Sequence, residues 1–262
     1  MTTITIIADN SVSEMRPKGL VAEWGFAAIV DDVLFDTGQT GAAVENARRL
    51  RGDATFETIV LSHGHYDHTG GLPPFLAVDE AQTVYAHPDA FEPKFKEDTH
   101  IGLPYTRGRI ESDATVVEHT APVEVAPGIH ALGEIPREHP DNAMGETIRD
   151  GERVADPILD DQALAVETDE GLVLVLGCGH AGVRNTVERA DAVFDAPLTA
   201  IIGGTHLVGS EPDEVVEITE WLDGRVDTLA TSHCTGVDNE EIVRDNFSGT
   251  FERAGVGATL EF

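Results

Sequence analysis

A chain of 262 residues with 41% hydrophobic side chains can bury a sizeable core, and its length predicts one domain over residues 1–262. The 48 acidic and 17 basic residues leave a formal charge of −31, which excludes nucleic acid and anionic membranes as partners unless a local basic patch exists. An acidic, lysine-poor surface is typical of proteins from salt-rich cytoplasm, so we expect a halophilic, archaeal source. An ordinary acidic enzyme is the alternative.

Apolar runs with a period of two predict strands, and longer amphipathic runs predict helices. In chain order the pattern predicts strands at Thr3–Ala8, Phe26–Val30 and Val33–Phe35, a helix at Ala42–Arg51, strands at Thr58–Leu61, Thr83–Ala86, Thr115–Glu118, Ile129–Leu132, Ala163–Glu167 and Leu172–Leu176, a helix at Val183–Ala192, a strand at Ala200–Ile202, a helix at Asp213–Leu222, a strand at Thr228–Thr231, a helix at Glu240–Phe247 and a strand at Thr259–Phe262. Strand meanders interleaved with helices predict an α/β fold with two β-sheets face to face, each covered by helices: a four-layer αββα sandwich.

Two segments, near residues 92–112 and 134–161, interrupt this pattern with several prolines and glycines. Long irregular insertions in a compact domain are often lids or substrate loops, and variable surface loops are the equal alternative. The first insertion holds a local basic cluster in a chain with few basic residues. We expect this cluster to bind an anionic substrate through Lys94, Lys96, Arg107 and Arg109.

The N-terminus lacks the basic start and long apolar run of a signal peptide, and no stretch approaches the roughly 20 apolar residues that span a bilayer. Only two cysteines occur, Cys178 and Cys234, so a disulfide framework is not expected. We therefore expect a cytoplasmic protein with a small-molecule substrate and no nucleic acid or membrane partner. A homodimer is one possible assembly.

The strongest functional signal directly follows the predicted strand Thr58–Leu61 and reads Ser62-His63-Gly64-His65-Tyr66-Asp67-His68. An extended segment projects His63 and His65 to one side, and a turn at Asp67 and His68 directs a carboxylate and an imidazole toward a second point. These ligand types suit zinc, iron or manganese, and two such ions about 3.5–4 Å apart can share one hydroxide. A solvated histidine-rich loop is the alternative, which the spacing after a buried strand disfavours.

This motif resembles that of the metallo-β-lactamase superfamily, and the resemblance extends over nearly the whole chain. Asp36, after the strand Val33–Phe35, resembles the aspartate that orients the site in that family. His180, in Gly177-Cys178-Gly179-His180, and His233, in Ser232-His233-Cys234, resemble the remaining histidine ligands. The resemblance implies one metal ion on His63, His65 and His180 and a second on Asp67, His68 and His233. One or two divalent ions are expected, with zinc favoured over manganese or iron.

One departure from the family lies at Gly203-Gly204-Thr205-His206, where most members have an aspartate that bridges the two metals. Without that anion two dications repel more strongly, so the second site should bind more weakly or rely on His206 or a substrate oxygen. His206 is interpreted as a ligand, as a proton donor to the leaving group, or as a packed histidine, and a functional role is favoured. Both cysteines flank proposed ligands. Packing at a strand end is the simpler interpretation for Cys178, and thiolate ligation is the alternative.

These residues favour a metal-dependent hydrolase in which a metal-bound hydroxide attacks an ester or phosphoester, with Asp67 and His206 as catalytic residues and Asp36 supporting the ligands. The motifs around His180, His206 and His233 also resemble a narrower branch, the proteins similar to 7,8-dihydropterin-6-methyl-4-(β-D-ribofuranosyl)aminobenzene-5′-phosphate synthase. That resemblance implies an alternative: a dihydropteroate-synthase-like transferase that joins a dihydropterin-methyl diphosphate to an arylamine in a methanopterin-type pathway. A non-catalytic or redox metal protein is the third hypothesis.

Overall fold

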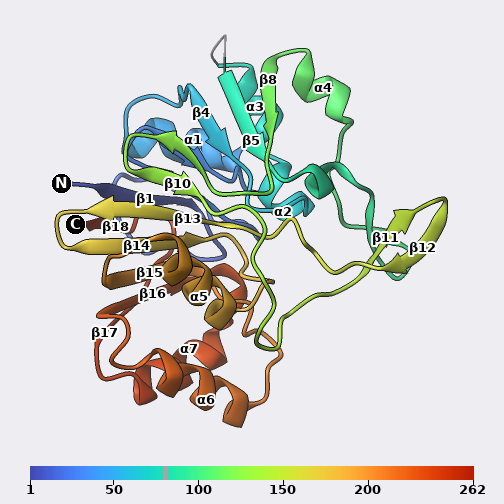
Figure 1. The fold of residues 1–262 in the computed structure, drawn as a ribbon. Coiled ribbons are helices and arrows are strands. Elements are labelled where there is room, and N and C mark those ends of the chain that lie inside the picture. Colours follow the sequence, from blue (N-terminus) through green and yellow to red (C-terminus); the bar gives the residue numbers. More distant parts are fainter. Residues whose placement is uncertain (79–81) are drawn as a thin grey trace.

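The computed structural model describes residues 1–78 and 82–262, and two seven-stranded sheets form its centre (Figure 1). The first sheet has the order β18-β1-β2-β3-β4-β5-β8, in which β3, β4, β5 and β8 run parallel. Its strands are β1 (Thr3–Ala8), β2 (Ala27–Val30), β3 (Val33–Phe35), β4 (Thr58–Val60), β5 (Gln82–Ala86), β8 (Ala114–Glu118) and β18 (Thr259–Glu261).

The second sheet has the order β17-β16-β15-β14-β13-β10-β9, in which β14 to β17 run parallel. Its strands are β9 (Val123–Ala126), β10 (Ile129–Ala131), β13 (Ala163–Thr168), β14 (Gly171–Leu176), β15 (Leu198–Gly204), β16 (Thr228–Ser232) and β17 (Thr250–Arg253). Each sheet thus has an antiparallel half and a parallel half. The parallel halves matter for function because their carboxyl ends meet at one edge.

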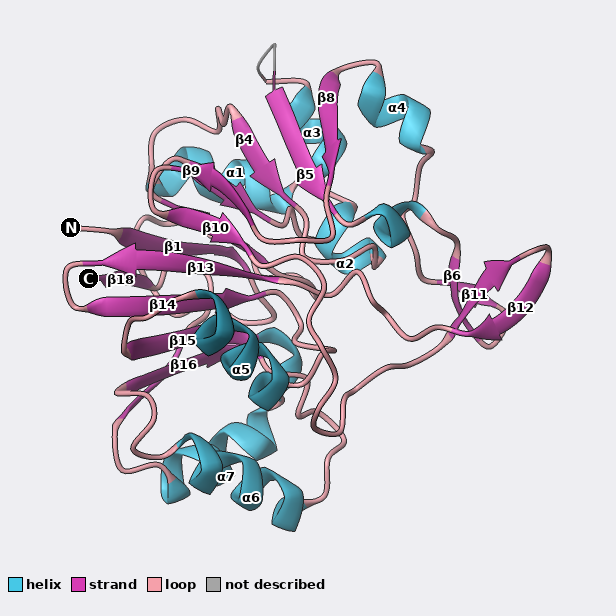
Figure 2. Cartoon of the chain, viewed as in Figure 1, coloured by secondary structure: helices cyan, strands magenta, loops and turns pink. Residues whose placement is uncertain are grey.

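Helices cover the outer face of each sheet, as Figure 2 shows. On the first sheet these are α1 (Ala42–Leu50) and α3 (Leu72–Leu76), with α4 (Arg107–Glu111) beside β8; on the second they are α5 (Val183–Val193), α6 (Pro212–Leu222) and α7 (Val237–Asn246). The predicted four-layer αββα sandwich is therefore confirmed. None of the helices in the described part of the chain is long and apolar enough to cross a membrane.

The alternation of side chains along β14 explains why the central strands of the sheets are continuous apolar runs in the sequence. Val173 and Val175 point into the core between the sheets, whereas Leu172, Leu174 and Leu176 pack beneath the helices. A strand that is buried on both faces needs apolar residues at every position. At roughly 25 cal/mol per Å² of buried apolar surface, such burial is the main stabilising contribution in a fold of this kind.

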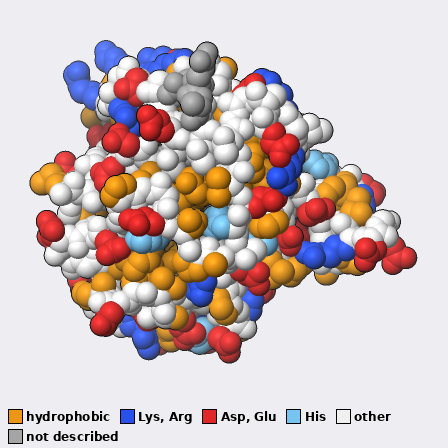
Figure 3. All heavy atoms as spheres, turned by 45° about the horizontal axis from the view of Figure 1, so that its top comes forward, with side chains coloured by type: hydrophobic (Ala, Val, Ile, Leu, Met, Phe, Trp, Pro, Cys, Tyr) orange, Lys and Arg blue, Asp and Glu red, His pale blue; other side chains and the backbone are white. Residues whose placement is uncertain are grey.

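The sequence led us to expect two irregular insertions. In the structure both contain strands, and these strands pair with each other. They form a third sheet of order β12-β11-β6-β7, in which Glu146 lies opposite Phe95 and Thr147 opposite Lys94. Its strands are β6 (Lys94–Lys96), β7 (Thr99–His100), β11 (Glu146–Arg149) and β12 (Glu152–Ala155). The β11–β12 hairpin projects from the body of the molecule, and Figure 3 shows acidic side chains around this projection and scattered over the same face.

Lys94 was predicted to bind substrate, and the structure corrects that prediction. Its side chain is 1% exposed, and its Nζ lies 2.9 Å from an oxygen of Asp156 and 2.8 Å from an oxygen of Asp160. Asp160 also accepts a hydrogen bond from the backbone N–H of Gly64 at 2.7 Å, within the histidine motif. The buried lysine therefore joins the two insertions to the histidine motif, and its charge is neutralised.

We expect Lys94→Ala to lower the free energy of unfolding by about 3–5 kcal/mol, because two buried carboxylates would lose their cation. Lys96→Ala is the matched control, since Lys96 is exposed on the same strand and its loss should change stability by less than about 0.5 kcal/mol. Urea unfolding of both variants measures the difference. Equal stability of the two variants would contradict the structural role of Lys94.

Candidate metal centre

The candidate ligands converge where parallel strands of the two sheets end. Ligands bind at the carboxyl ends of strands in open α/β sheets, because side chains from several loops meet there. The ligand positions are His63 and His65 after β4, Asp67 and His68 in the short helix α2 (Tyr66–Thr69), His180 after β14, His206 after β15 and His233 after β16.

The first triad consists of His63, His65 and His180, whose ligand atoms lie within 4.8 Å of one another. The Nε2 atom of His63 is 2.9 Å from Nδ1 of His65. All three side chains are buried. Three buried ring nitrogens directed at one point are a suitable ligand set for zinc or another transition metal.

The second triad consists of Asp67, His68 and His233, whose ligand atoms also lie within 4.8 Å of one another. His233 Nε2 is 3.6 Å from Asp67 Oδ2. The rings of His68 and His63 are 4.2 Å apart between centroids, so the two triads are adjacent. The structure thus brings together both ligand sets that the resemblance implied.

Hydrogen bonds fix the tautomers of two histidines of the first triad, His63 and His180. His180 Nδ1 donates to the backbone carbonyl oxygen of Asn142 at 3.0 Å. His63 Nδ1 lies 2.9 Å from Ser62 Oγ, and that hydroxyl donates its own proton to Asp36 Oδ2 at 2.6 Å, so the imidazole must be the donor to Ser62. Both histidines therefore carry the proton on Nδ1 and leave the lone pair of Nε2 free for a metal.

The second triad is oriented in the same way. His68 Nδ1 donates to Asp36 Oδ2 at 2.7 Å, and His233 Nδ1 donates to Asn10 Oδ1 at 3.1 Å. The Asn10 amide is fixed because its Nδ2 donates to the His233 carbonyl oxygen at 2.9 Å. Asp36 is completely buried and also accepts the backbone N–H of Ser62 at 2.7 Å. It thus contacts His68 directly and His63 through Ser62, one histidine of each triad.

Several ring nitrogens in this cluster are buried without a hydrogen-bond partner. Such atoms are rare in proteins, and a bound ion is one of the few reasons for them. They are the Nε2 atoms of His68, His180 and His233. The donor set, its burial and these unpaired ring nitrogens fit divalent metal ions.

The electrostatics of the cluster separate His68 from the other histidines. Burial lowers the pKa of His63 and His180 well below the usual value, that of His65 to about 4 and that of His233 to about 3. Burial acts in the same direction on His68, but the charge of Asp36 outweighs it and raises the pKa of His68 to about 9. In the metal-free chain four imidazoles are therefore neutral at pH 7, and His68 is the one in these two triads that a metal must deprotonate.

A cavity of about 400 Å³ opens onto the two triads. Apolar side chains form part of its wall, among them Trp24, Ile101, Met144 and Val208. The indole N–H of Trp24 donates to Asp67 Oδ2 at 2.9 Å, so this residue both lines the cavity and orients a ligand. The volume is in the range of small-molecule sites, and apolar walls with polar groups at the base are typical of them.

Of the predicted basic cluster, Lys96 lines the cavity. Arg107 forms exposed ion pairs with Glu111 and Glu118, and it borders a separate groove together with Phe91. Arg109 pairs with Asp113 at 2.8 Å. Lys94, Arg107 and Arg109 thus form ion pairs with acidic side chains. Of the four predicted substrate-binding residues, Lys96 is the one that lines the cavity.

His206 lies at the edge of the first triad. Its ring centroid is 4.2 Å from that of His180, and it lines the cavity. Its backbone φ of 49° lies in the left-handed region, which is strained for a residue with a side chain and is often found at functional sites. Burial lowers the pKa of His206, so in the metal-free chain its imidazole is neutral at pH 7 and can accept a proton or a hydrogen bond.

Three supporting residues were missed in the sequence. Asp9 accepts the backbone N–H of His233 at 2.6 Å, Asn10 orients the ring of His233, and Trp24 binds Asp67. The signal for the first two was their position directly after the predicted strand Thr3–Ala8, which ends beside the other strands at the site. Trp24 lies in a segment without periodicity and had no comparable signal.

One glycine is required by close approach. A Cβ at Gly177 would meet Ser62 Oγ and lie 2.6 Å from Asp36 Oδ2. The end of β14 can therefore reach the Asp36 network because this residue has no side chain.

A sequence-family model described as the metallo-beta-lactamase superfamily matches residues 31–194. This chain belongs to the metallo-β-lactamase superfamily. An uncharacterized protein of Methanocaldococcus jannaschii is 32% identical over 244 residues, which cover 89% of this chain and 90% of the relative. From the same organism, 7,8-dihydropterin-6-methyl-4-(beta-D-ribofuranosyl)-aminobenzene-5'-phosphate synthase is 29% identical over 247 residues, covering 88% and 84%. The predicted similarity to that branch of the superfamily is thus confirmed.

Among solved structures of the superfamily, that of Tm1679, described as a metal-dependent hydrolase, superimposes with a TM-score of 0.90. It is 30% identical and covers 100% of this chain and 99% of its own. The metallo-β-lactamase protein YhfI from Bacillus subtilis has a TM-score of 0.59 at 14% identity, with full coverage of both chains, and shows the fold alone.

Proposed function

We propose that this chain is a metal-dependent hydrolase acting on an ester or phosphoester that carries a negative charge. The observation that carries the proposal is the pair of adjacent triads, with their unpaired buried ring nitrogens, beside a cavity of about 400 Å³. Metal ions bound there, for which zinc is the first candidate, would lower the pKa of a bound water to about 7 and polarise the group under attack.

The residues of the chain have distinct roles in this reaction. Asp67, held by Trp24, would bind metal and orient the attacking water. His206 faces the cavity as a neutral imidazole and can receive a proton or hydrogen-bond the leaving group. Lys96 supplies a positive charge at the cavity wall for the anionic part of the substrate.

The experiment that tests the hydrolase proposal is a substrate panel of phosphodiesters, phosphomonoesters, lactones and thioesters, assayed with the zinc-loaded protein at low and high salt. We expect hydrolysis of at least one anionic member, loss of that activity on chelation, and its recovery on addition of zinc. A fully loaded protein that hydrolyses none of these classes would contradict the proposal.

For an anionic substrate found in this panel, Lys96→Gln should raise KM about tenfold with little change in kcat, because the lost contact is one charge-assisted hydrogen bond worth about 1.4 kcal/mol. Lys18→Gln is the control, since Lys18 is exposed and does not line the cavity. Steady-state kinetics of the two variants decide the question. A similar KM for both would exclude Lys96 from substrate binding.

The pterin transferase is the second candidate, favoured by the relative named 7,8-dihydropterin-6-methyl-4-(beta-D-ribofuranosyl)-aminobenzene-5'-phosphate synthase and by the flat indole of Trp24 in the cavity wall. In that reaction the same residues would hold the metals that bind a diphosphate leaving group. Calorimetric titration with a dihydropterin separates the two proposals. Binding at micromolar concentration, together with product formation only when an arylamine is present, would favour the transferase, and no binding would remove its support.

A further inference from the structure

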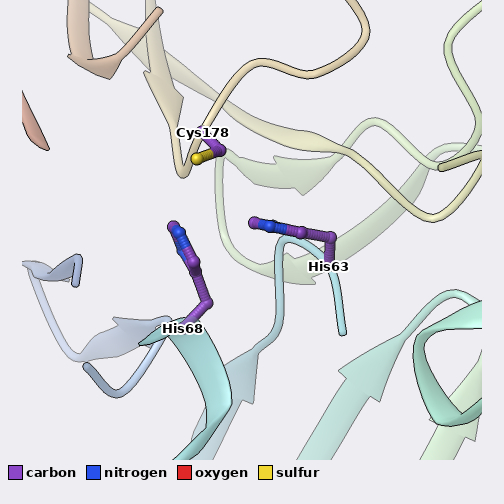
Figure 4. A group of neighbouring side chains, drawn as sticks. All are labelled: His63, His68 and Cys178. Carbon is purple, nitrogen blue, oxygen red and sulfur yellow. The ribbon is translucent and has the colours of Figure 1, made fainter. Parts of the chain in front are cut away.

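The side chain of Cys178 lies among the ring nitrogens of the metal-binding histidines. It follows β14 and precedes His180 by two residues, and its side chain is buried. Its Sγ forms a group with ring nitrogens of His63 and His68 in which all atoms lie within 4.8 Å of one another. Figure 4 shows the two imidazoles and the thiol directed toward a common space.

The contacts of Cys178 are divided between the two triads. Its Sγ also groups with His180, from the first triad, and with His233, from the second, within the same 4.8 Å limit. His68 Nε2, which points toward the sulfur, is completely buried and has no hydrogen-bond partner. A single atom with neighbours in both ligand sets has the position of a bridge rather than that of a ligand to one metal.

The charges of the cluster leave a need for such a bridge. Asp67 is the one anion in the two triads, although two divalent ions would bring four positive charges. The loop Gly203–His206 contributes no carboxylate. A second anion between the ions would reduce their repulsion, and a coordinating thiol loses its proton when bound to a metal.

We propose that the Cys178 thiolate bridges the two metal ions and takes the place of the missing carboxylate. The inference rests on the proposed metal-dependent function. On metal binding the S–H bond breaks, the sulfur forms a bond to each ion, and the proton leaves to solvent. Because thiolate is a soft ligand, the site should select zinc, iron or cobalt over magnesium or manganese.

Cys234 provides the matched control for this proposal. Its Sγ lies 3.1 Å from the Cys178 sulfur and donates to the Cys178 carbonyl oxygen at 3.2 Å, so it is equally buried and in direct contact. Its Sγ groups with Cys178 and His233, of the second triad, but with no histidine of the first triad and not with His68, so unlike Cys178 it does not have neighbours in both ligand sets. Cys234 therefore positions Cys178, and its replacement by serine should leave the bridge in place.

The test measures bound metal and the sulfur ligand directly, without an activity assay. Wild-type protein should bind two zinc ions per chain, show zinc–sulfur scattering near 2.3 Å in X-ray absorption, and show a thiolate-to-cobalt charge-transfer band when loaded with Co²⁺. Cys178→Ser should lose the band and the sulfur scattering, and the affinity for the second ion should fall by at least about 100-fold. Cys234→Ser should retain all three properties.

Each outcome has a distinct meaning. Two zinc ions without sulfur scattering in the wild type would overturn the thiolate bridge and leave the hydrolase proposal intact. Loss of the band in Cys234→Ser but not in Cys178→Ser would assign the ligand to Cys234 and overturn the proposal as well. A wild-type protein that binds no metal would instead refute the metal-dependent function on which the bridge rests. The wild-type spectra decide the matter even if Cys178→Ser does not fold.

Discussion

Replacement of His65 by alanine is expected to abolish metal binding at the first triad and, with it, catalytic turnover. The Nδ1 atom of His65 lies 2.9 Å from Nε2 of His63, so removal of the ring takes away one of the three nitrogens that meet at this point. Two remaining imidazoles form an incomplete site for an ion that prefers four ligands. Elemental analysis and turnover, measured on the same preparation, check both parts of the prediction.

A suitable control for this variant is His130→Ala, because His130 lies on β10, is partly buried and pairs with Glu167 away from the cavity. It should keep the metal content and turnover of the wild type. Retained turnover with normal metal content in His65→Ala would refute the arrangement of the first triad.

Replacement of Asp36 by alanine is expected to affect both stability and metal binding. The buried carboxylate accepts three hydrogen bonds, two from Ser62 and one from His68, and the variant leaves all three donors without an acceptor. Loss of one partner of a buried ion pair costs about 3–5 kcal/mol of stability. Loss of the acceptor behind a metal ligand lowers metal affinity by about 10–100-fold.

The effect of Asp36→Ala on the metal-free protein should also depend on pH. The folded-state pKa of His68, about 9, lies above its ordinary value of 6.5, so the stability that the ion pair contributes is fully present below about pH 6.5 and is lost as pH rises through 9. The difference between wild type and variant should therefore be largest at acidic pH and shrink above about pH 9. Denaturant unfolding of the apo proteins at several pH values measures this difference.

The exposed residue Asp98 is the corresponding control, because its carboxylate is solvated and Asp98→Ala should be nearly neutral. If Asp36→Ala unfolded at the same denaturant concentration as Asp98→Ala at every pH, the Asp36 network would not have the structural role assigned to it here.

The layered fold could be predicted because local patterns dominate it. The strand at Thr3–Ala8 has the predicted bounds, and the strand at Leu172–Leu176 differs by one residue. Both were visible because buried strands need apolar side chains in a fixed period. Helix α7 begins at Val237, three residues before the predicted start, because the segment after the candidate ligand His233 leads directly into its first turn. The histidine motif and the order of the later histidines identified the positions that meet at the site.

What the sequence did not reveal depends on contacts between distant segments. The strands β6 and β11 are short, and each is recognisable as a strand only through pairing with a partner about fifty residues away in the chain. The prediction that Lys94 binds substrate was wrong because it considered the charge of the side chain and not its burial. Its two partners, Asp156 and Asp160, lie in the other insertion, so the sequence around Lys94 does not reveal them. Trp24 donates a hydrogen bond to Asp67 from a segment 43 residues earlier in the chain, a contact that no local spacing encodes.

The pairing of the two insertions has a consequence for how this branch of the superfamily can diversify. Each insertion supplies part of the cavity wall, Lys96 and Ile101 from one and Met144 from the other. Since β6 and β11 share a ladder and Lys94 is neutralised by the partner segment, neither insertion can be lengthened, shortened or exchanged alone without loss of the other. The two insertions should therefore change together among relatives that differ in substrate preference. Chimeras that exchange both insertions should fold, whereas chimeras that exchange only one should not.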